Sequence, residues 1–399
     1  MPITVMQPQD DAMTASAFKL SRREFSLGGL AAVWTARFSF AEDTYHPSRV
    51  LLGTTGSVSK GIYSAAWNAT TGELGPITLA APLVAPTFLA TRRDGARTLI
   101  YSVSEGGKSD SSVSALATVP GSSELRLINT VSSVGDGPTH LSLSPDGRSV
   151  FIANYGGGSI SSYHVKDDGS LSEVVSHVQY EGAGPDHARQ AQSHAHSAQV
   201  SPNGRFLLVN DLGLDRICIY RIDRKTAALK PNDPPVWQAR PASGPRHIAF
   251  HPNGKWLYSV NELDSTVDVL RWDAAHGRLT AVDHVSTLKP GFPPDTAFAG
   301  EILISADGRY LYVGNRIGDE TIAVFQVAAD TGKLTLKQLA SNGGKTTRHI
   351  AVDATGGWMV ASNQDSNEIV VLRRDVATGE LSAPVHRYPL NKPMFATWI

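Results

Sequence analysis

Residues 139–178 decide the fold, and they read THLSLSPDGRSVFIANYGGGSISSYHVKDDGSLSEVVSHV. The stretch contains four strand-like runs, which occupy residues 139–144, 149–154, 159–165 and 171–178. Tight turns separate the first two runs and the last two, at Asp146-Gly147 and at Asp168-Gly169. Asp-Gly pairs favour such turns because they adopt positive φ angles at little cost. The stretch therefore predicts a sheet of four antiparallel strands joined by short connections.

The same pattern recurs along the chain, and its first turn is the clearest marker. The marker turns are Asp94-Gly95, Asp146-Gly147, Asn203-Gly204, Asn253-Gly254, Asp307-Gly308 and the degenerate Thr355-Gly356. They follow one another at spacings of 52, 57, 50, 54 and 48 residues. Repeats of this length with four strands each are typical of the blades of a β-propeller. Six turns predict six complete blades.

The two ends of the chain predict a seventh blade. Residues 49–83 contain three strand-like segments, at 49–54, 61–67 and 77–81, but no strand that precedes them. The apolar segment Pro393–Ile399 lacks partners of its own. Pairing it with the N-terminal segments completes the blade and leaves no exposed sheet edge. We therefore predict an all-β, seven-bladed β-propeller with four antiparallel strands per blade, closed by the C-terminal strand.

The first residues are interpreted as a targeting segment. A paired-arginine motif spans Ser21–Phe25, a short apolar stretch spans Leu27–Val33, and Ser39-Phe40-Ala41 fits a cleavage site. This order is typical of a twin-arginine export signal. The alternative is a disordered tail with a chance Arg-Arg pair. We predict a signal at residues 1–41, a propeller domain at 42–399 and a periplasmic or secreted location.

Composition excludes several classes of function. The chain has 36 basic and 37 acidic residues, so its charge gives no reason to expect a nucleic acid partner. The apolar stretch near the N-terminus is too short to span a bilayer, so we expect no stable membrane insertion. Cys218 is the only cysteine, which excludes an intramolecular disulfide and a thiolate metal cluster. The sequence carries no signal for an oligomeric state.

Alignment of the repeats on their turns locates a candidate site. The first strand of a propeller blade lines the central channel, so equivalent residues near its start gather at one mouth. Seven residues before the turn stand Thr87, Thr139, His196, Arg246, Gly300 and Arg348. Six residues before it stand Phe88, His140, Ser197, His247, Glu301 and His349. These positions are polar and differ between blades, which indicates that each blade contributes one group to a common site.

The end of the second strand shows a related pattern. The aligned pairs are Asn154-Tyr155, Asn210-Asp211, Asn261-Glu262, Asn315-Arg316 and Asn363-Gln364. The recurring asparagine is interpreted as structural, because its side chain can bond the backbone of a turn. The variable residue that follows it is expected at the same mouth.

The candidate residues combine proton acceptors with cations, which ester hydrolysis requires. His196 or Glu262 is predicted to take a proton from water, and Arg246 and Arg316 to bind the carbonyl and oxyanion. The predicted substrate contacts are His140, His247, Glu301, Arg348 and His349. Two simpler interpretations stay open. Arg246 and Glu262 can form a structural ion pair, and the three equivalent histidines, His140, His247 and His349, can be structural hydrogen-bond donors.

A metal site is the less favoured interpretation. His194 and His196 lie two apart on a strand, and His187 is near them, so they can face one side and share a metal. A third ligand with clear spacing is missing. We therefore predict neither a metal nor another cofactor.

Several motifs resemble those of the seven-bladed lactonase family. They are His196-Ser197-Ala198, Gly244-Pro245-Arg246-His247, Val260-Asn261-Glu262-Leu263, the run from Ala306 to Tyr312, and Asn315-Arg316. That family includes propeller-type 6-phosphogluconolactonases, periplasmic gluconolactonases and the fungal carboxymuconate-lactonizing cyclase. In the cyclase a His, two Arg and a Glu are implicated, and they match His196, Arg246, Arg316 and Glu262.

The resemblance implies a lactonase that opens a small cyclic ester of a sugar. The export motif favours an unphosphorylated lactone such as gluconolactone over a phosphorylated one. The arginines at the mouth can still hold a phosphate, so a lactonase of the 6-phosphogluconolactonase type stays open. Two other functions remain open. One is a muconate-type lactonizing cycloisomerase, and the other is a non-catalytic propeller that binds a ligand or partner at its mouth.

Overall fold

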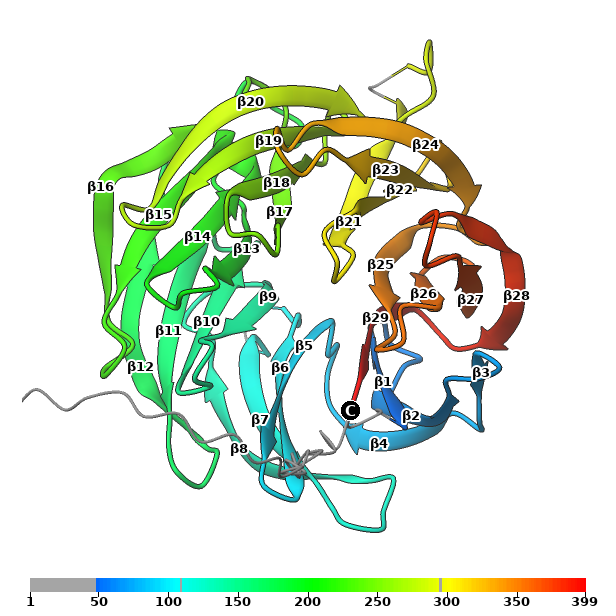
Figure 1. Cartoon of the computed structure of the whole chain (residues 1–399). Coiled ribbons are helices and arrows are strands. Elements are labelled where there is room, and N and C mark those ends of the chain that lie inside the picture. Colours follow the sequence, from blue (N-terminus) through cyan, green and yellow to red (C-terminus); the bar gives the residue numbers. More distant parts are fainter. Residues whose placement is uncertain (1–47, 108–109, 294–295) are drawn as a thin grey trace, which may run out of the picture. The chain divides into compact units, whose positions relative to one another are not determined.

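The computed structural model describes residues 48–107, 110–293 and 296–399. These residues form seven sheets arranged around a central channel (Figure 1). Apart from the short 3-10 turn η1 (Leu212–Leu214), the regular elements described are β-strands. The predicted export signal at residues 1–41 lies outside the described residues, as do residues 42–47. Among the described residues, no helix is long and apolar enough to cross a membrane.

Six blades follow one another along the chain, each with its first strand at the channel. Blade 2 consists of β5 (Phe88–Asp94), β6 (Arg97–Ser104), β7 (Ser112–Thr118) and β8 (Leu125–Ser132); blade 3 of β9 (Pro138–Leu143), β10 (Ser149–Asn154), β11 (Ser159–Val165) and β12 (Leu171–Gln179); blade 4 of β13 (Ala195–Val200), β14 (Phe206–Asp211), β15 (Arg216–Ile222) and β16 (Leu229–Gln238). Blade 5 consists of β17 (Pro245–Phe250), β18 (Trp256–Asn261), β19 (Thr266–Asp273) and β20 (Arg278–Ser286); blade 6 of β21 (Phe298–Ile304), β22 (Tyr310–Arg316), β23 (Thr321–Val327) and β24 (Leu334–Ser341); blade 7 of β25 (Thr347–Val352), β26 (Trp358–Asn363), β27 (Glu368–Arg374) and β28 (Leu381–Pro389).

Blade 1 is assembled from both ends of the chain. The C-terminal strand β29 (Pro393–Trp398) pairs antiparallel with β1 (Arg49–Thr54), with Val50 opposite Trp398 and Leu52 opposite Ala396. The strands β2 (Gly61–Asn68) and β4 (Thr78–Pro82) complete the sheet, and the two-residue β3 (Glu73–Leu74) pairs with β2. The predicted seven-bladed ring and its closure are confirmed.

The hydrophobic core is divided among the seams between blades. In the described residues, each of the seven seams holds one cluster of buried side chains drawn from the two blades that meet there. Alternate residues of β10 face different seams: Val150 and Ile152 contact blade 2, whereas Phe151 and Ala153 contact blade 4. Because successive side chains of a strand point to opposite faces, a blade packed on both sides needs an uninterrupted apolar run.

In three blades, the recurring asparagine ties the blade to the one before it. The Nδ2 groups of Asn154, Asn315 and Asn363 donate to the main-chain oxygens of Ser133, Thr287 and Asn342, respectively, at 3.3, 2.9 and 3.1 Å. Those oxygens belong to the connections that leave the preceding blades. In these three blades the asparagine is structural, as the sequence indicated.

The predicted alignment was wrong by one residue in blade 4. Ala195 pairs with Asp211 there, at the position where Pro245 pairs with Asn261 in blade 5. Asp211 therefore takes the place of the asparagine, and its carboxylate accepts hydrogen bonds from the main-chain N–H of His194 and from the hydroxyl of Ser193. A carboxylate can bind the neighbouring connection at this position by accepting hydrogen bonds. The sequence alignment used Asn210 instead, which lies one residue before the structurally equivalent position.

Replacing Asn315 by Ala tests this tie between blades. The side chain is fully buried and makes three hydrogen bonds, to Thr287 O, Thr321 Oγ1 and Thr287 Oγ1. We expect Asn315→Ala to lower the free energy of unfolding in urea by about 1–3 kcal/mol, because buried polar groups lose their partners. The exposed Asn391→Ala is the control, with an expected change within about 0.5 kcal/mol. Equal stability of the two variants would contradict the structural role.

Candidate active site

Irregular pairing in the channel strands places adjacent residues in the same channel. Neighbouring residues of a regular strand face opposite sides, whereas a β-bulge leaves one residue unpaired and redirects its side chain. The pairing of the first strand with the second shifts at this point in blades 3, 4, 5 and 7. The residues left unpaired there are Thr139, His196, Arg246 and Arg348. In these four blades the residues seven and six before the turn therefore form two successive layers of the channel.

The upper layer opens into a cavity of about 280 Å³. Four predicted site residues line it: His196, Glu262, Arg316 and Arg348. They come from four different blades: His196 and Arg348 from first strands, and Glu262 and Arg316 from the end of a second strand. The volume lies near the lower end of the usual range for small-molecule sites, about 300–1,000 Å³. The cavity therefore fits a small ligand.

Glu262 lies at the centre of an arginine cluster. Its Oε2 accepts hydrogen bonds from Arg246 Nε at 3.1 Å and Arg316 Nη2 at 2.5 Å, and its Oε1 accepts one from Arg189 Nη2 at 2.5 Å. The predicted pair of Arg246 and Glu262 thus forms as part of a larger network. Burial alone raises the pKa of Glu262, but Arg316, Arg246 and Arg189 outweigh it and lower the pKa to about 2. Glu262 is therefore a permanently charged group at neutral pH.

Two guanidinium groups of the cavity keep unused donors. The Nε atoms of Arg316 and Arg348 are buried and have no hydrogen-bond partner among the described residues. Unsatisfied buried donors are costly, so such atoms often indicate the place of a ligand. A carbonyl or oxyanion oxygen in the cavity is a suitable acceptor for them.

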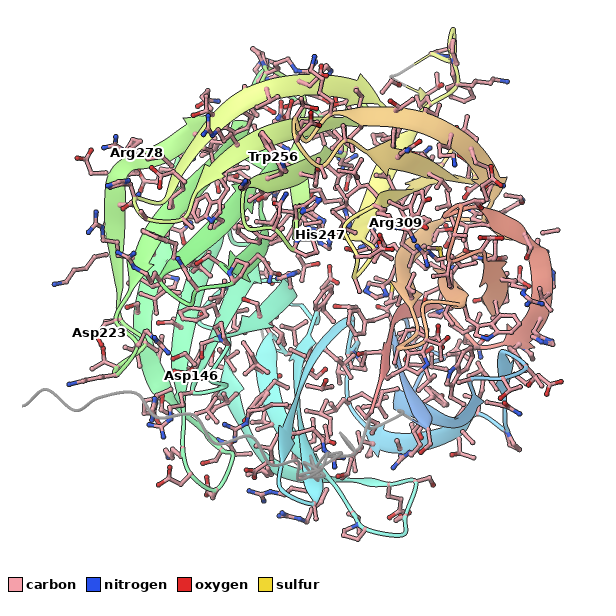
Figure 2. All side chains as sticks on the ribbon, viewed as in Figure 1. Asp146, Asp223, His247, Trp256, Arg278 and Arg309 are labelled. Atoms are coloured by element: carbon pink, nitrogen blue, oxygen red, sulfur yellow. The ribbon has the colours of Figure 1, made fainter. Side chains whose placement is uncertain are left out.

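The lower layer consists mainly of histidine and aromatic rings. His247 lies at the centre of the ring (Figure 2), with ring centroids 5.2 Å from His140 and 5.0 Å from His196. Its Nδ1 lies 3.1 Å from both carboxylate oxygens of Glu301. His349 Nε2 lies 3.9 Å from Glu301 Oε2.

The channel histidines are neutral at pH 7. Burial, reinforced by Arg246, lowers the pKa of His196 and His247 well below the ordinary value. Burial and the neighbouring His247 do the same to the pKa of His140, and burial lowers the pKa of His349 to about 4 although Glu301 opposes it. His140 and His349 accept hydrogen bonds at Nδ1 from the N–H groups of Ala198 and Ala396 in the next blade. At Nδ1 these two rings are therefore acceptors and not the donors that the sequence suggested.

The predicted site residues line two adjoining spaces. Arg246, His247, Glu301 and His349 line a smaller chamber of about 10 Å³ and not the main cavity. Arg348 lines both spaces. His140 lines neither of them.

Sequence reasoning missed two charged residues of the cavity, Arg189 and Glu105. Arg189 lies in the connection 180–194 between β12 and β13, and the only signal for it was the longest spacing between turns. Glu105 follows β6, and its N–H bonds Ala85 O just as the N–H of Tyr155 bonds Gly137 O in blade 3. The alignment did not identify Glu105 because Ser104 stands where blades 3 to 7 have Asn or Asp.

The histidines that were considered for a metal lie in different surroundings. The ring of His194 stacks on Tyr155 with centroids 4.4 Å apart, and its Nδ1 lies 2.9 Å from Tyr155 O. His187 is exposed, whereas His196 lines the cavity. Within the ranges that the structure describes, no group of three His, Cys, Asp or Glu side chains is arranged to hold a metal ion.

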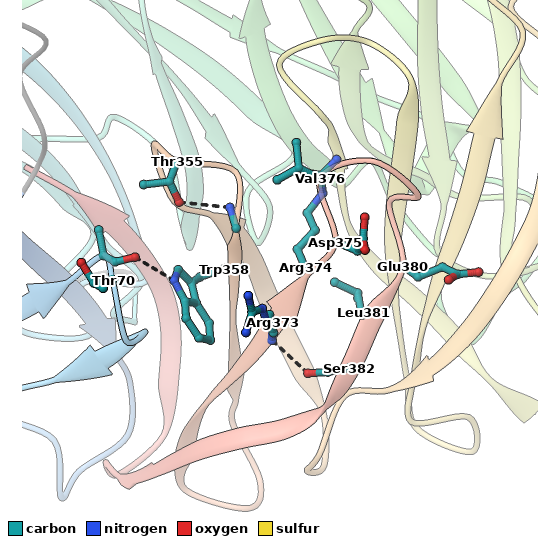
Figure 3. A pocket seen from close by; sticks show the side chains of 12 residues that line it. Thr70, Thr355, Trp358, Arg373, Arg374, Asp375, Val376, Glu380, Leu381 and Ser382 are labelled. Carbon is teal, nitrogen blue, oxygen red and sulfur yellow. Dashed lines mark hydrogen bonds between the residues drawn. The ribbon is translucent and has the colours of Figure 1, made fainter.

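A larger hollow of about 610 Å³ lies away from the channel, on blade 7 and the adjoining part of blade 1 (Figure 3). Its lining includes Trp358, Arg373, Arg374 and Asp375, and the indole N–H of Trp358 bonds Ala69 O across the seam. None of the predicted site residues lines it. The convergence of blade-equivalent residues favours the channel cavity as the active site.

Comparison with known proteins agrees with this architecture. The family model described as "Lactonase, 7-bladed beta-propeller" matches residues 49–398. A 6-phosphogluconolactonase of Bacillus subtilis (strain 168) is 34% identical over 324 residues, which cover 81% of this chain and 90% of the relative. The solved structure of a periplasmic gluconolactonase of Pseudomonas aeruginosa aligns with a TM-score of 0.82 at 30% identity and covers 88% of this chain and 98% of the other.

The charge of Glu262 gives a testable dependence of stability on pH. Its pKa in the folded protein, about 2, lies below the ordinary 4.5, so its contribution is complete above pH 4.5 and is lost as the pH falls toward 2. We expect Glu262→Gln to be less stable than the wild type at pH 7, and the difference to shrink between about pH 4.5 and 2. Urea unfolding at pH 7, 4 and 3 measures it, with the exposed Glu380→Gln as control. A difference that stays constant down to pH 3 would contradict the ion-pair network.

Proposed function

Because this chain belongs to the lactonase family of seven-bladed β-propellers, we propose that it hydrolyses an unphosphorylated sugar lactone such as gluconolactone. Hydrolysis of sugar lactones is supported for the family by relatives named 6-phosphogluconolactonase. The choice of lactone and the roles of individual residues are our proposals.

One observation carries the proposed chemistry: the unpartnered Nε groups of Arg316 and Arg348 at the cavity. When water attacks a lactone carbonyl, negative charge develops on the carbonyl oxygen. Fixed donors in a site of low water content stabilise that oxyanion without reorganising. Arg316 and Arg348 supply such donors, and Glu262 holds Arg316 in place from below.

The geometry changes the roles first assigned to Glu262 and Arg246. Arginines occupy both oxygens of Glu262 and hold its pKa at about 2, so it is a poor proton acceptor. Arg246 donates to Glu262 and to Gly300 O and does not line the main cavity. Arg246 therefore supports the cluster, whereas His196 contacts the lactone.

The charge of the cavity favours a neutral substrate. Its lining contains Arg189, Arg316 and Arg348 against Glu105 and Glu262, which with a neutral His196 leaves a formal charge of +1. An unphosphorylated lactone is neutral and develops one negative charge when water attacks it. The formal charge of +1 in the cavity lining balances that charge. A phosphate group adds about two further negative charges. After the two glutamates of the lining are paired, only one arginine charge remains to balance them.

Location supports the same substrate. The motif at Ser21–Phe25 is typical of twin-arginine export, and one structural neighbour is a periplasmic gluconolactonase. We propose export of this chain to the periplasm, where unphosphorylated aldonolactones are the accessible sugar lactones.

The assay compares gluconolactone with 6-phosphogluconolactone by the acid that ring opening releases, after subtraction of spontaneous hydrolysis. We expect faster turnover of the unphosphorylated compound. Arg316→Gln should lower kcat/KM by about 10²–10³, because it removes an oxyanion donor. The control is Arg373→Gln, whose exposed side chain lies outside the channel. Equal activity of wild type and Arg316→Gln on every lactone would refute the proposed role, and preference for the phosphorylated lactone would refute the substrate.

A further inference from the structure

Below the substrate cavity lies a polar chamber that fits a single water molecule. Its volume is about 10 Å³, and a cavity needs about 10–15 Å³ on this measure to hold one water. Glu105, Thr139 and Arg348 line both the chamber and the cavity, so the two spaces adjoin. A molecule in the chamber therefore lies next to a substrate in the cavity.

The walls of the chamber offer hydrogen-bonding atoms that the protein leaves unused. His247 Nε2 and Thr87 Oγ1 are buried and have no partner among the described residues. One of them accepts and the other donates, which is the pair of contacts that a water molecule can satisfy at once. Ordered waters in proteins typically occupy such places.

Glu301 fixes the proton of His247. An ionised carboxylate only accepts hydrogen bonds, so the Nδ1 that lies 3.1 Å from both Glu301 oxygens carries the proton. The lone pair of the neutral ring is then on Nε2, toward the chamber. A carboxylate that holds an imidazole in this tautomer is the arrangement found in general-base dyads.

The other channel histidines lack this arrangement. His140 and His349 accept main-chain hydrogen bonds at Nδ1, so their protons are on Nε2. His196 has a buried Nδ1 without a partner, so no carboxylate fixes its tautomer. Among these four histidines, only His247 has a carboxylate that holds the proton on Nδ1 and leaves Nε2 free to accept another.

The charged and titratable neighbours of His247 come from several strands. They are His140 on β9, His196 on β13, Arg246 on β17, Glu301 on β21, Arg316 on β22, and Arg348 and His349 on β25, together with Glu262. Burial, reinforced by the arginines, lowers the pKa of His247 and keeps the ring neutral, and the carboxylate of Glu301 lies next to the ring when it takes up a proton.

We propose that the chamber holds the attacking water and that His247, oriented by Glu301, accepts its proton. The inference deepens the proposed lactone hydrolysis and rests on it. His247 is the catalytic residue because it touches the reacting water, and Glu301 is a positioning residue.

The step balances without a further reactant. The water oxygen bonds to the carbonyl carbon while one water proton moves to His247 Nε2, and the oxyanion forms against Arg316 and Arg348. The oxyanion then collapses, the bond from the carbonyl carbon to the ring oxygen breaks, and the proton on Nε2 passes to that ring oxygen. The product is the open hydroxy acid, and His247 is neutral again.

The test uses substitutions that separate catalysis from a structural tie between blades 5 and 6. His247→Asn keeps a donor near the Nδ1 position, and so the bond to Glu301, but removes Nε2. We expect kcat on the best lactone to fall by about 10²–10⁴, the usual value of a general base, with little change in KM. Glu301→Gln should lower kcat less and move the acid limb of the kcat/KM profile to lower pH. His276→Asn is the matched control: it makes the same change in an exposed histidine whose Nδ1 lies 2.8 Å from the carboxylate of Asp273, outside both spaces, and it should leave kcat and the pH profile unchanged.

Two results would overturn the inference. One is a folded His247→Asn variant that keeps wild-type kcat while the wild type opens lactones, which would leave the proposed function intact. The other is a high-resolution crystal structure without an ordered water within hydrogen-bond distance of His247 Nε2. A wild-type protein that opens no lactone would overturn the proposed function and this inference together.

Discussion

The structure depends on one constraint: each blade is apolar on both faces and must be covered on both sides. The clusters at the seams draw on two blades each, so no blade can bury its surface alone. An open row of blades would leave two apolar faces and a sheet edge exposed, and only a closed ring removes them. The channel, and with it the site, is a consequence of that closure.

Most of the fold could be predicted because the repeated turns report local geometry directly. Glycines such as Gly147 and Gly308 have φ angles of 66° and 73°, so each marked a tight hairpin as the sequence indicated. The error in blade 4 arose where an equivalent position is filled by different chemistry. Asp211 binds the connection before its blade by accepting hydrogen bonds, whereas Asn154, Asn315 and Asn363 bind the corresponding connections mainly by donating them. A search for repeated residue types does not detect that equivalence.

The candidate site was predicted less completely, since its depth and its partners depend on three-dimensional detail. Alignment on the turns selected His196, Glu262, Arg316 and Arg348, but it did not separate the cavity from the layer beneath. The bulges that turn neighbouring residues into one channel leave no mark in the sequence. Arg189 comes from an irregular connection without a repeat, so no alignment of blades could identify it. Glu262 is a poor base because arginines bind both of its carboxylate oxygens. Those contacts can be seen only in the three-dimensional structure.

The origin of blade 1 also bears on how the molecule folds. Its channel strand β29 pairs with β1, and the residues of the six other blades lie between these two strands in the sequence. Until β29 is in place, β1 lacks its inner partner and the seams on either side of blade 1 remain incomplete. Closure of the ring is therefore a highly non-local step, and contacts between residues that are distant in sequence slow the folding of a domain.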